Sequence, residues 1–158
     1  MLPRAPIDPE GTFSGLSASA ILFGAFVDIA ATVVASTLLV LWLAPEVAAQ
    51  EEAQAHEVLA KLYTSQRYVV ANLALGALCT VIGAFAGAHR AGQLHVRHGG
   101  WIAVTSTALG VLLTALQPVP APDAATAPLW AEVTAWLLIL PAGMLGGALA
   151  ASLQRSRS

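Results

Sequence analysis

One acidic residue, Asp28, stands inside a long apolar stretch of the sequence. Residues 16–44 hold no other charged side chain. A helix over this stretch would carry Asp28 about eleven residues from its start, roughly 12–16 Å deep in a bilayer at 1.5 Å per residue. Inserting an acid at that depth costs about 2.5–3.5 kcal/mol. Such a residue is either a polar clasp that holds helices together or a protonatable site on an ion pathway.

The surroundings of Asp28 can be predicted from the same reasoning. No Lys, Arg or His reaches its depth, and low dielectric favours the neutral form of an unpaired carboxyl group. We therefore expect Asp28 to be protonated at neutral pH and to accept hydrogen bonds from Thr32 or Thr80. It would donate to a backbone carbonyl, with that of Leu137 as a candidate, because Pro141 has no N–H to give it. The predicted intramembrane polar site is Asp28, Thr32 and Thr80.

A second group of reactive side chains consists of His89, His95 and His98, with Arg90 and Arg97 beside them. Three imidazoles could ligate a metal ion. No two of them are four residues apart, however, which is the interval that aligns two ligands on one helix face, and no carboxylate lies among them. We expect no metal site and no cofactor here. A basic loop that faces anionic lipid headgroups is the simpler interpretation.

The composition indicates where these side chains must lie. Of 158 residues, 57% are hydrophobic and 10% are charged, whereas soluble domains carry roughly 25% charged residues. This chain has too little polar surface for an ordinary soluble enzyme, a disordered protein or a nucleic-acid binder. Its single cysteine, Cys79, excludes a disulfide within the chain. We predict an integral membrane protein whose first partner is the lipid bilayer, with no nucleic acid bound.

Four stretches are almost free of charge and approach the roughly 20 residues that cross a bilayer. Each must be helical, because lipid offers the backbone no hydrogen bonds. The sequence therefore predicts an all-α fold, a four-helix antiparallel transmembrane bundle that forms one membrane domain over residues 16–153. The helices are predicted at about 16–44, 68–89, 99–117 and 129–153.

Basic residues are distributed unevenly between the two sides of this arrangement. One side holds Arg4, Arg90, Arg97, Arg155 and Arg157, and the other holds only Lys61 and Arg67. Because Lys and Arg are enriched in cytoplasmic segments, we expect both termini in the cytoplasm, as flexible tails over residues 1–15 and 154–158. The outer loop, residues 45–67, is predicted to contain a short surface helix that leads into the second span.

Small residues at four-residue spacing form one stripe on each predicted helix. Helix association in lipid relies on close backbone contact at such residues. We predict helix packing through Gly24, Gly76, Gly83, Gly87, Gly110, Gly143 and Gly147. If all stripes face inward, equal depth places Cys79, Thr80, Gly110 and Gly143 beside Asp28. The sequence leaves open whether one stripe forms a dimer interface instead.

Three short motifs carry a resemblance to a known group of proteins. They are GAFVDI at 24–29, TVIGAFAG at 80–87 and LPAGMLGG at 140–147. In these motifs the chain resembles small uncharacterised four-helix integral membrane proteins of bacteria. The resemblance implies a location in the bacterial inner membrane and no known activity. Four helices and an acid in the first one are also similar to small multidrug resistance transporters, although the outer loop, the charge bias and the longer first span differ from theirs.

The sequence supports two hypotheses about function. No paired carboxylates, no nucleophile with a base and no metal-ligand set occur in any span, so we expect no enzyme. The first hypothesis is a non-enzymatic inner-membrane protein that scaffolds or modulates a membrane protein partner. The alternative is a small proton-coupled transporter or channel subunit that uses Asp28, a homo-oligomer because four helices leave little room for a pathway. An Asp28→Asn substitution discriminates between the two.

Overall fold

The computed structural model describes residues 14–49, 51–116 and 128–156. Within this part the chain is helical and contains no strand. Its elements are α1 (Ala18–Leu43), the 3-10 helix η1 (Pro45–Ala49), α2 (Glu52–Thr64), α3 (Gln66–Ala91), α4 (His95–Ala115) and α5 (Leu129–Arg155). The prediction of an all-α fold is confirmed. Most of the predicted tail over 1–15 and the last two residues of the other tail lie outside the described residues.

The helix ends follow from local side-chain chemistry. Ser17 caps α1, with its hydroxyl accepting from the backbone N–H of Ala20 at 3.3 Å. Ser65 caps α3 in the same way and accepts from Tyr68 N–H at 3.3 Å. Such caps satisfy N–H groups that have no partner within the helix. α1 ends two residues before Pro45, because a proline disfavours helical backbone in the residue before it.

Three of the helices, α1, α3 and α5, are long and apolar enough to cross a membrane. Their length and composition mark the chain as a membrane protein. α4 is also long, with 21 residues, but it is less apolar because it begins with His95, Arg97 and His98 and carries several hydroxyl side chains. The prediction of four spans is therefore supported by length and composition for three of the four long helices.

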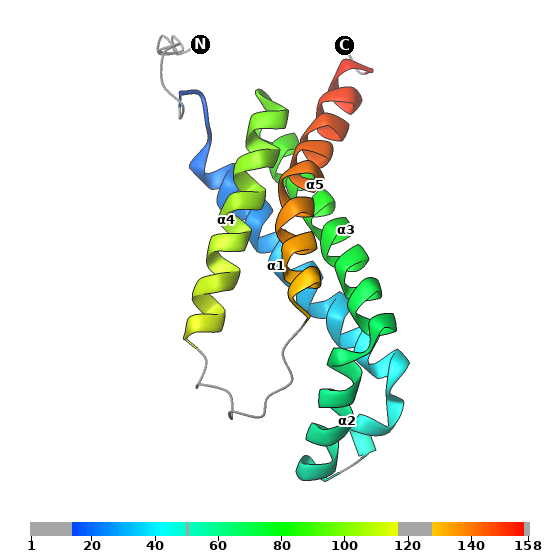
Figure 1. The fold of residues 1–158 in the computed structure, drawn as a ribbon. Helices are drawn as coiled ribbons and strands as arrows, with labels where there is room; N and C mark the ends of the chain where they lie inside the picture. The colour runs from blue at the N-terminus through cyan, green and yellow to red at the C-terminus, as the bar shows by residue number, and fades with distance from the viewer. Residues whose placement is uncertain (1–13, 50, 117–127, 157–158) are drawn as a thin grey trace.

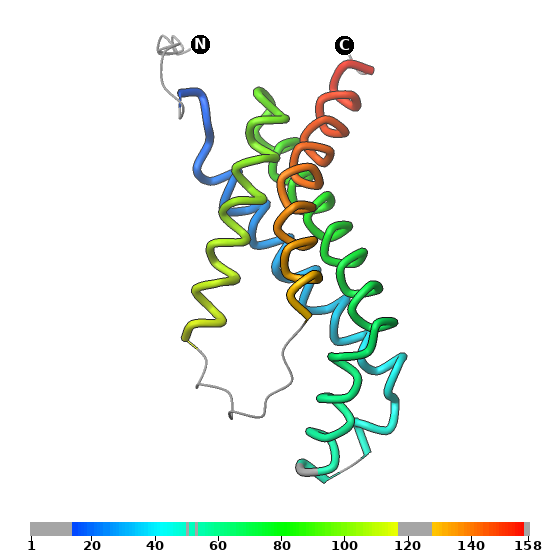
Figure 2. The backbone as a smooth tube through the Cα atoms, in the orientation of Figure 1, coloured from blue at the N-terminus to red at the C-terminus, as the bar shows by residue number. Residues whose placement is uncertain are grey.

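The four long helices run alternately up and down, so that the two ends of the described chain lie together (Figure 1). We call this the terminal end of the bundle, and the opposite end, where α2 lies, the α2 end. α3 packs most extensively on α5 and α1, and α4 packs mainly on α5. Figure 2 shows that α4 and α5 lie close together near the terminal end and diverge toward the α2 end. This divergence determines the site described below.

Of the two described connections between long helices, one differs from the sequence prediction and the other agrees with it. The loop expected between the second and third spans is only Gly92–Leu94, because α3 extends to Ala91 and α4 begins at His95, four residues before the predicted start at Gly99. Gly92 and Leu94 both have left-handed backbone, with φ of 72° and 49°, which allows so tight a turn. At the other end, the surface helix predicted within residues 45–67 is confirmed as α2.

Candidate functional site

Toward the terminal end, glycines bring helix backbones into direct contact. A Cβ at Gly83 of α3 would lie 2.7 Å from the carbonyl oxygen of Gly24 on α1, and a Cβ at Gly87 would lie 2.9 Å from Gly24 Cα. Side chains at these positions would force α1 and α3 apart, because such distances are well inside van der Waals contact. The two helices therefore meet through Gly24, Gly83 and Gly87, as the small-residue stripes predict.

Glycines also allow close backbone contact between α4 and α5. A Cβ at Gly143 of α5 would lie 2.6 Å from the Cβ of Ala103, and one at Gly147 would lie 2.8 Å from the Cα of Val96. Gly99 of α4 contacts Gly143 in return. Gly99 is absent from the predicted packing residues because the sequence predicts a span that starts there. In the structure Gly99 lies in the second turn of α4.

Gly76 and Gly110 behave differently. Neither has an atom of another element within 4 Å of the position of a Cβ, so the prediction that they pack helices together is wrong. The physical reason is the divergence of α4, which leaves these residues without a facing backbone. Both line a cavity instead.

This cavity lies between α1, α3, α4 and α5 on the α2 side of the glycine contacts and has a volume of about 840 Å³. Asp28, Thr80 and Ser106 form its floor, and its walls extend along α4 to Thr114 and Ala115. Further polar side chains line it, namely Thr32, Asn72, Thr107 and Thr114. Its volume is within the roughly 300–1,000 Å³ typical of small-molecule sites.

The carboxyl group of Asp28 is held by hydroxyl groups from three helices. Ser106 Oγ lies 2.6 Å from Oδ2, Thr80 Oγ1 lies 3.3 Å from both carboxyl oxygens, and Thr32 Oγ1 lies 3.5 Å from Oδ1. Asp28 is only 4% exposed. Within the described part of the chain, no Lys, Arg or His makes an ion pair with it. The structure thus brings together the predicted Asp28, Thr32 and Thr80 and adds Ser106.

Equal depth in the predicted helices puts Gly110 at the level of Asp28, whereas the structure puts Ser106 there. α4 begins four residues earlier than predicted. The residue found at any given depth therefore also lies four positions earlier in the sequence. Ser106 belongs to the same small-residue stripe as Gly110 and lies four residues before it. Gly143 also differs from the prediction, because it contacts Gly99 and Ala103 rather than the carboxyl group.

The carbonyl of Leu137 is not the partner of Asp28 either. The carboxyl bonds to hydroxyls of α1, α3 and α4, whereas Leu137 is 70% exposed on the surface of α5. α1 packs on α3 and α4 and has no extensive contact with α5. The two helices occupy opposite corners of the bundle, which the sequence pattern does not reveal.

The hydroxyl groups can satisfy Asp28 with or without its proton. When the carboxyl is ionised, Ser106, Thr80 and Thr32 can all donate to it, since a hydroxyl both donates and accepts. When it is protonated, Oδ2 can donate to Ser106 Oγ, and the Ser106 hydroxyl can turn to the Ile102 carbonyl oxygen at 3.0 Å. Only hydrogen atoms need to move between the two states. The site can therefore take up and release a proton without rearrangement of the helices.

The histidine group serves a different purpose. His98 is fully buried, and its Nε2 accepts from the backbone N–H of Ser17 at 2.9 Å. Its Nδ1 therefore carries the proton and donates to the Leu94 carbonyl oxygen at 3.2 Å. His89 stacks on Phe85, with 5.8 Å between ring centroids. No group of three or more metal-ligating side chains was found among the described residues.

The position of the three histidines also corrects the predicted basic loop. His89 lies in the last turn of α3, and His95 and His98 lie in the first turn of α4. Of the basic residues beside them, Arg90 lies over the ring of Phe23, 4.9 Å from its centroid. His98 thus fixes the start of α1 against α4.

The polar site and its cavity are the features on which a functional assignment can rest. Comparison of the chain with protein-family models, with curated proteins and with solved structures finds no match.

Proposed function

We propose that the chain is a multi-pass protein of the bacterial inner membrane that binds and releases a proton at Asp28, as a small proton-coupled transporter or channel subunit. One observation carries the proposal: the carboxyl group of Asp28 lies at the floor of a cavity of about 840 Å³. A polar clasp needs only hydrogen bonds in a filled interface. A proton-binding site also needs space through which protons and water can reach the carboxyl group.

In this proposal α1, α3, α4 and α5 cross the bilayer as an antiparallel four-helix bundle with both termini in the cytoplasm. α4 has 21 residues, about 31 Å at 1.5 Å per residue, and the hydrocarbon core is about 30 Å thick. Three of its four hydroxyl side chains, Ser106, Thr107 and Thr114, line the cavity, which offsets its lower hydropathy. The excess of arginine at the terminal end supports the proposed orientation.

The chemistry of the cavity supports proton movement. Its lining is mostly apolar, with polar side chains at the floor and again at Thr114, about 12 Å from Ser106 along α4 at 1.5 Å per residue. Water held by the polar groups at the floor would give protons a route to the carboxyl group, since a buried water needs two to four polar partners. The structure describes one copy of the chain. We propose a homo-oligomer, because the cavity reaches toward the α2 end while the glycine contacts close the terminal end.

Proton flux into liposomes tests this function. The purified full chain is reconstituted with a pH-sensitive dye inside, and an inward pH gradient is applied. We expect dye acidification that falls at least tenfold in Asp28→Asn, because the amide cannot carry a proton. Glu52→Gln is the matched control: it removes an acid of α2, outside the bundle, and should leave the flux unchanged.

The other hypothesis, a scaffold for a membrane protein partner, makes the opposite prediction. If Asp28 is only a clasp, the wild-type chain moves no protons, and Asp28→Asn retains the fold and the partner. Absence of flux from correctly folded wild-type protein, or equal flux from wild type and Asp28→Asn, would overturn the proposed function.

A further inference from the structure

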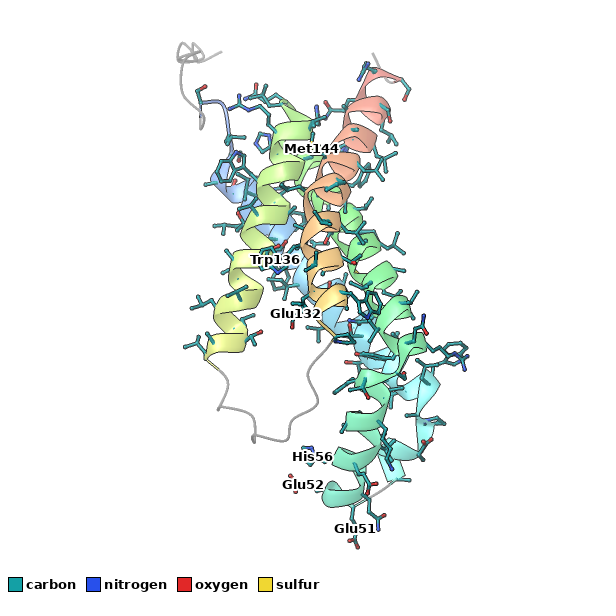
Figure 3. All side chains as sticks on the ribbon, viewed as in Figure 1. Glu51, Glu52, His56, Glu132, Trp136 and Met144 are labelled. Atoms are coloured by element: carbon teal, nitrogen blue, oxygen red, sulfur yellow. The ribbon has the colours of Figure 1, made fainter. Side chains whose placement is uncertain are left out.

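A second pocket lies at the α2 end, where α2, α3 and α5 approach one another. It has a volume of about 390 Å³. Tyr63 of α2, Tyr68 of α3 and Glu132 of α5 line it. Figure 3 shows Glu132 near the start of α5, with Met144 far along the same helix toward the terminal end. Asp28, Thr80 and Ser106, the floor of the larger cavity, do not line this pocket.

The two tyrosines present aromatic faces in different directions. Their ring centroids are 5.1 Å apart, and the ring planes are inclined by 49°. A cation within about 6 Å of such a ring is attracted by the electron density of its face. At this separation the two rings contact each other, so a cation would lie against their outward faces and edges rather than between them.

Glu132 supplies the negative charge, and the protein's own cations at this end are engaged elsewhere. The chain has two Lys or Arg residues between residues 44 and 89, Lys61 and Arg67. Lys61 pairs with Glu57 at 2.6 Å, and Arg67 lies over the ring of Trp42 at 5.3 Å. Among the described residues, no basic side chain forms an ion pair with Glu132. The carboxylate is left to attract a cation from outside.

The remaining lining selects the kind of cation. It is mostly apolar, with Val69, Leu73, Ala131 and Ala135. A single carboxylate is too few oxygen ligands for a hard metal ion such as Ca²⁺ or Mg²⁺. An alkylammonium group fits this set better, since its charge meets the carboxylate and the rings while its methyl groups contact the aliphatic side chains.

We infer that the pocket of Tyr63, Tyr68 and Glu132 binds a small organic cation of the alkylammonium class. Asn72, Leu73 and Ala135 line both this pocket and the Asp28 cavity, so the two spaces adjoin, and the pocket is proposed as one entrance to the cavity. The entrance role rests on the proposed function, whereas the binding itself does not.

Choline binding to the full chain in lipid nanodiscs tests the pocket, with isothermal titration calorimetry as the readout. 3,3-Dimethyl-1-butanol, which has the shape of choline without its charge, is the matched probe. We expect choline to bind at least tenfold more tightly than this alcohol. Glu132→Gln should weaken choline binding at least tenfold, and Tyr68→Leu should weaken it severalfold.

Two control variants separate the pocket from general effects on charge or folding. Glu52→Gln removes an acid of α2 that lines neither pocket and leaves the Lys61–Glu57 pair intact, so it should leave choline binding unchanged. Tyr63→Phe keeps the aromatic face and should also bind choline. Equal binding of choline and the alcohol, or unaltered choline binding in Glu132→Gln, would overturn the inference.

The entrance role is tested separately in the liposome assay. Choline on the side of the α2 end should reduce proton flux in wild type but not in Glu132→Gln. If choline binds through Glu132 without changing the flux, the entrance role is wrong and the pocket stands. Asp28→Asn should still bind choline, so failure of the proton function would not be mistaken for failure of the pocket.

Discussion

The two ends of the bundle use the same residue type for opposite purposes. At the terminal end, Gly83, Gly99 and Gly143 lie against backbone atoms of neighbouring helices, and a methyl group at any of them would overlap those atoms. At the α2 end, Gly76 and Gly110 face no other element and line a cavity of about 840 Å³. Asp28 lies at the boundary between the two regions.

This difference shows what a small-residue stripe means in a membrane helix. A glycine permits close approach, but whether a neighbour takes the space depends on the direction of the whole helix. α4 is held to α5 at one end by Gly99 and Gly143 and diverges from it at the other (Figure 1). The glycine contacts at the terminal end position the helices, and the divergence of α4 at the α2 end leaves room for solutes.

The largest loss of stability is expected from a methyl group added at the terminal end. Gly143→Ala places a Cβ 2.6 Å from that of Ala103 and should lower the free energy of unfolding by about 1–3 kcal/mol, the usual cost of overpacking. Gly110→Ala is the matched control and should cost nothing or stabilise by up to about 1 kcal/mol, since alanine favours the helix more than glycine does. Reversible unfolding in mixed detergent micelles measures both. Equal losses would show that the two ends do not differ in packing.

A second test removes the hydrogen bond between Ser17 and His98, which joins the start of α1 to α4 at the terminal end. His98→Leu deprives the Ser17 N–H of its acceptor, and leaving such a donor unpaired costs about 1–3 kcal/mol. Faster hydrogen exchange at the start of α1 should accompany the loss. His95→Leu is the comparison, because His95 Nε2 has no hydrogen-bond partner among the residues that the structure describes. If His95→Leu is equally harmful, the contact with Ser17 is not what matters.

The boundary between the two regions is tested by Ser106. Ser106→Ala removes the hydroxyl that lies 2.6 Å from Asp28 and should cost about 0.6–1.7 kcal/mol of unfolding free energy, the range for polar contacts between membrane helices. Thr107→Val is the paired control, since within the described part of the chain the Thr107 hydroxyl bonds only to the Ala103 carbonyl of its own helix, at 2.8 Å. Comparable losses in the two variants would mean that the Asp28–Ser106 bond does not stabilise the bundle.

The smallest effect on unfolding is expected on α2, at the α2 end of the bundle. The Lys61 ammonium lowers the pKa of Glu57 below its ordinary value of about 4.5. The pair therefore has its full effect above that value and loses it as the pH falls through the lowered pKa. Lys61→Met should return the Glu57 pKa toward the ordinary value, as followed by NMR of its side-chain carboxyl carbon. Because both side chains are mostly exposed, the unfolding of the bundle should not change, and a marked change would mean that α2 helps hold it together.

Much of the site follows from residue types alone. An acid within residues 16–44 has to find polar partners, and Thr32 lies one turn away on the same helix face. Thr80 follows from equal depth in an antiparallel neighbour. Ser106 was missed because its position depended on where α4 begins, and the left-handed backbone at Leu94 that allows the earlier start has no clear signal in a non-glycine residue.

Local sequence was sufficient for the existence of the four long helices and for the burial of Asp28. These features depend on interactions within a few residues and on the cost of placing polar groups in lipid. The angle at which α4 leaves α5, and with it the cavity, required the folded molecule. Helix direction is set by the sum of contacts along several helices, so Gly99 and Gly110, eleven residues apart on one helix, can look alike in sequence and yet serve opposite roles.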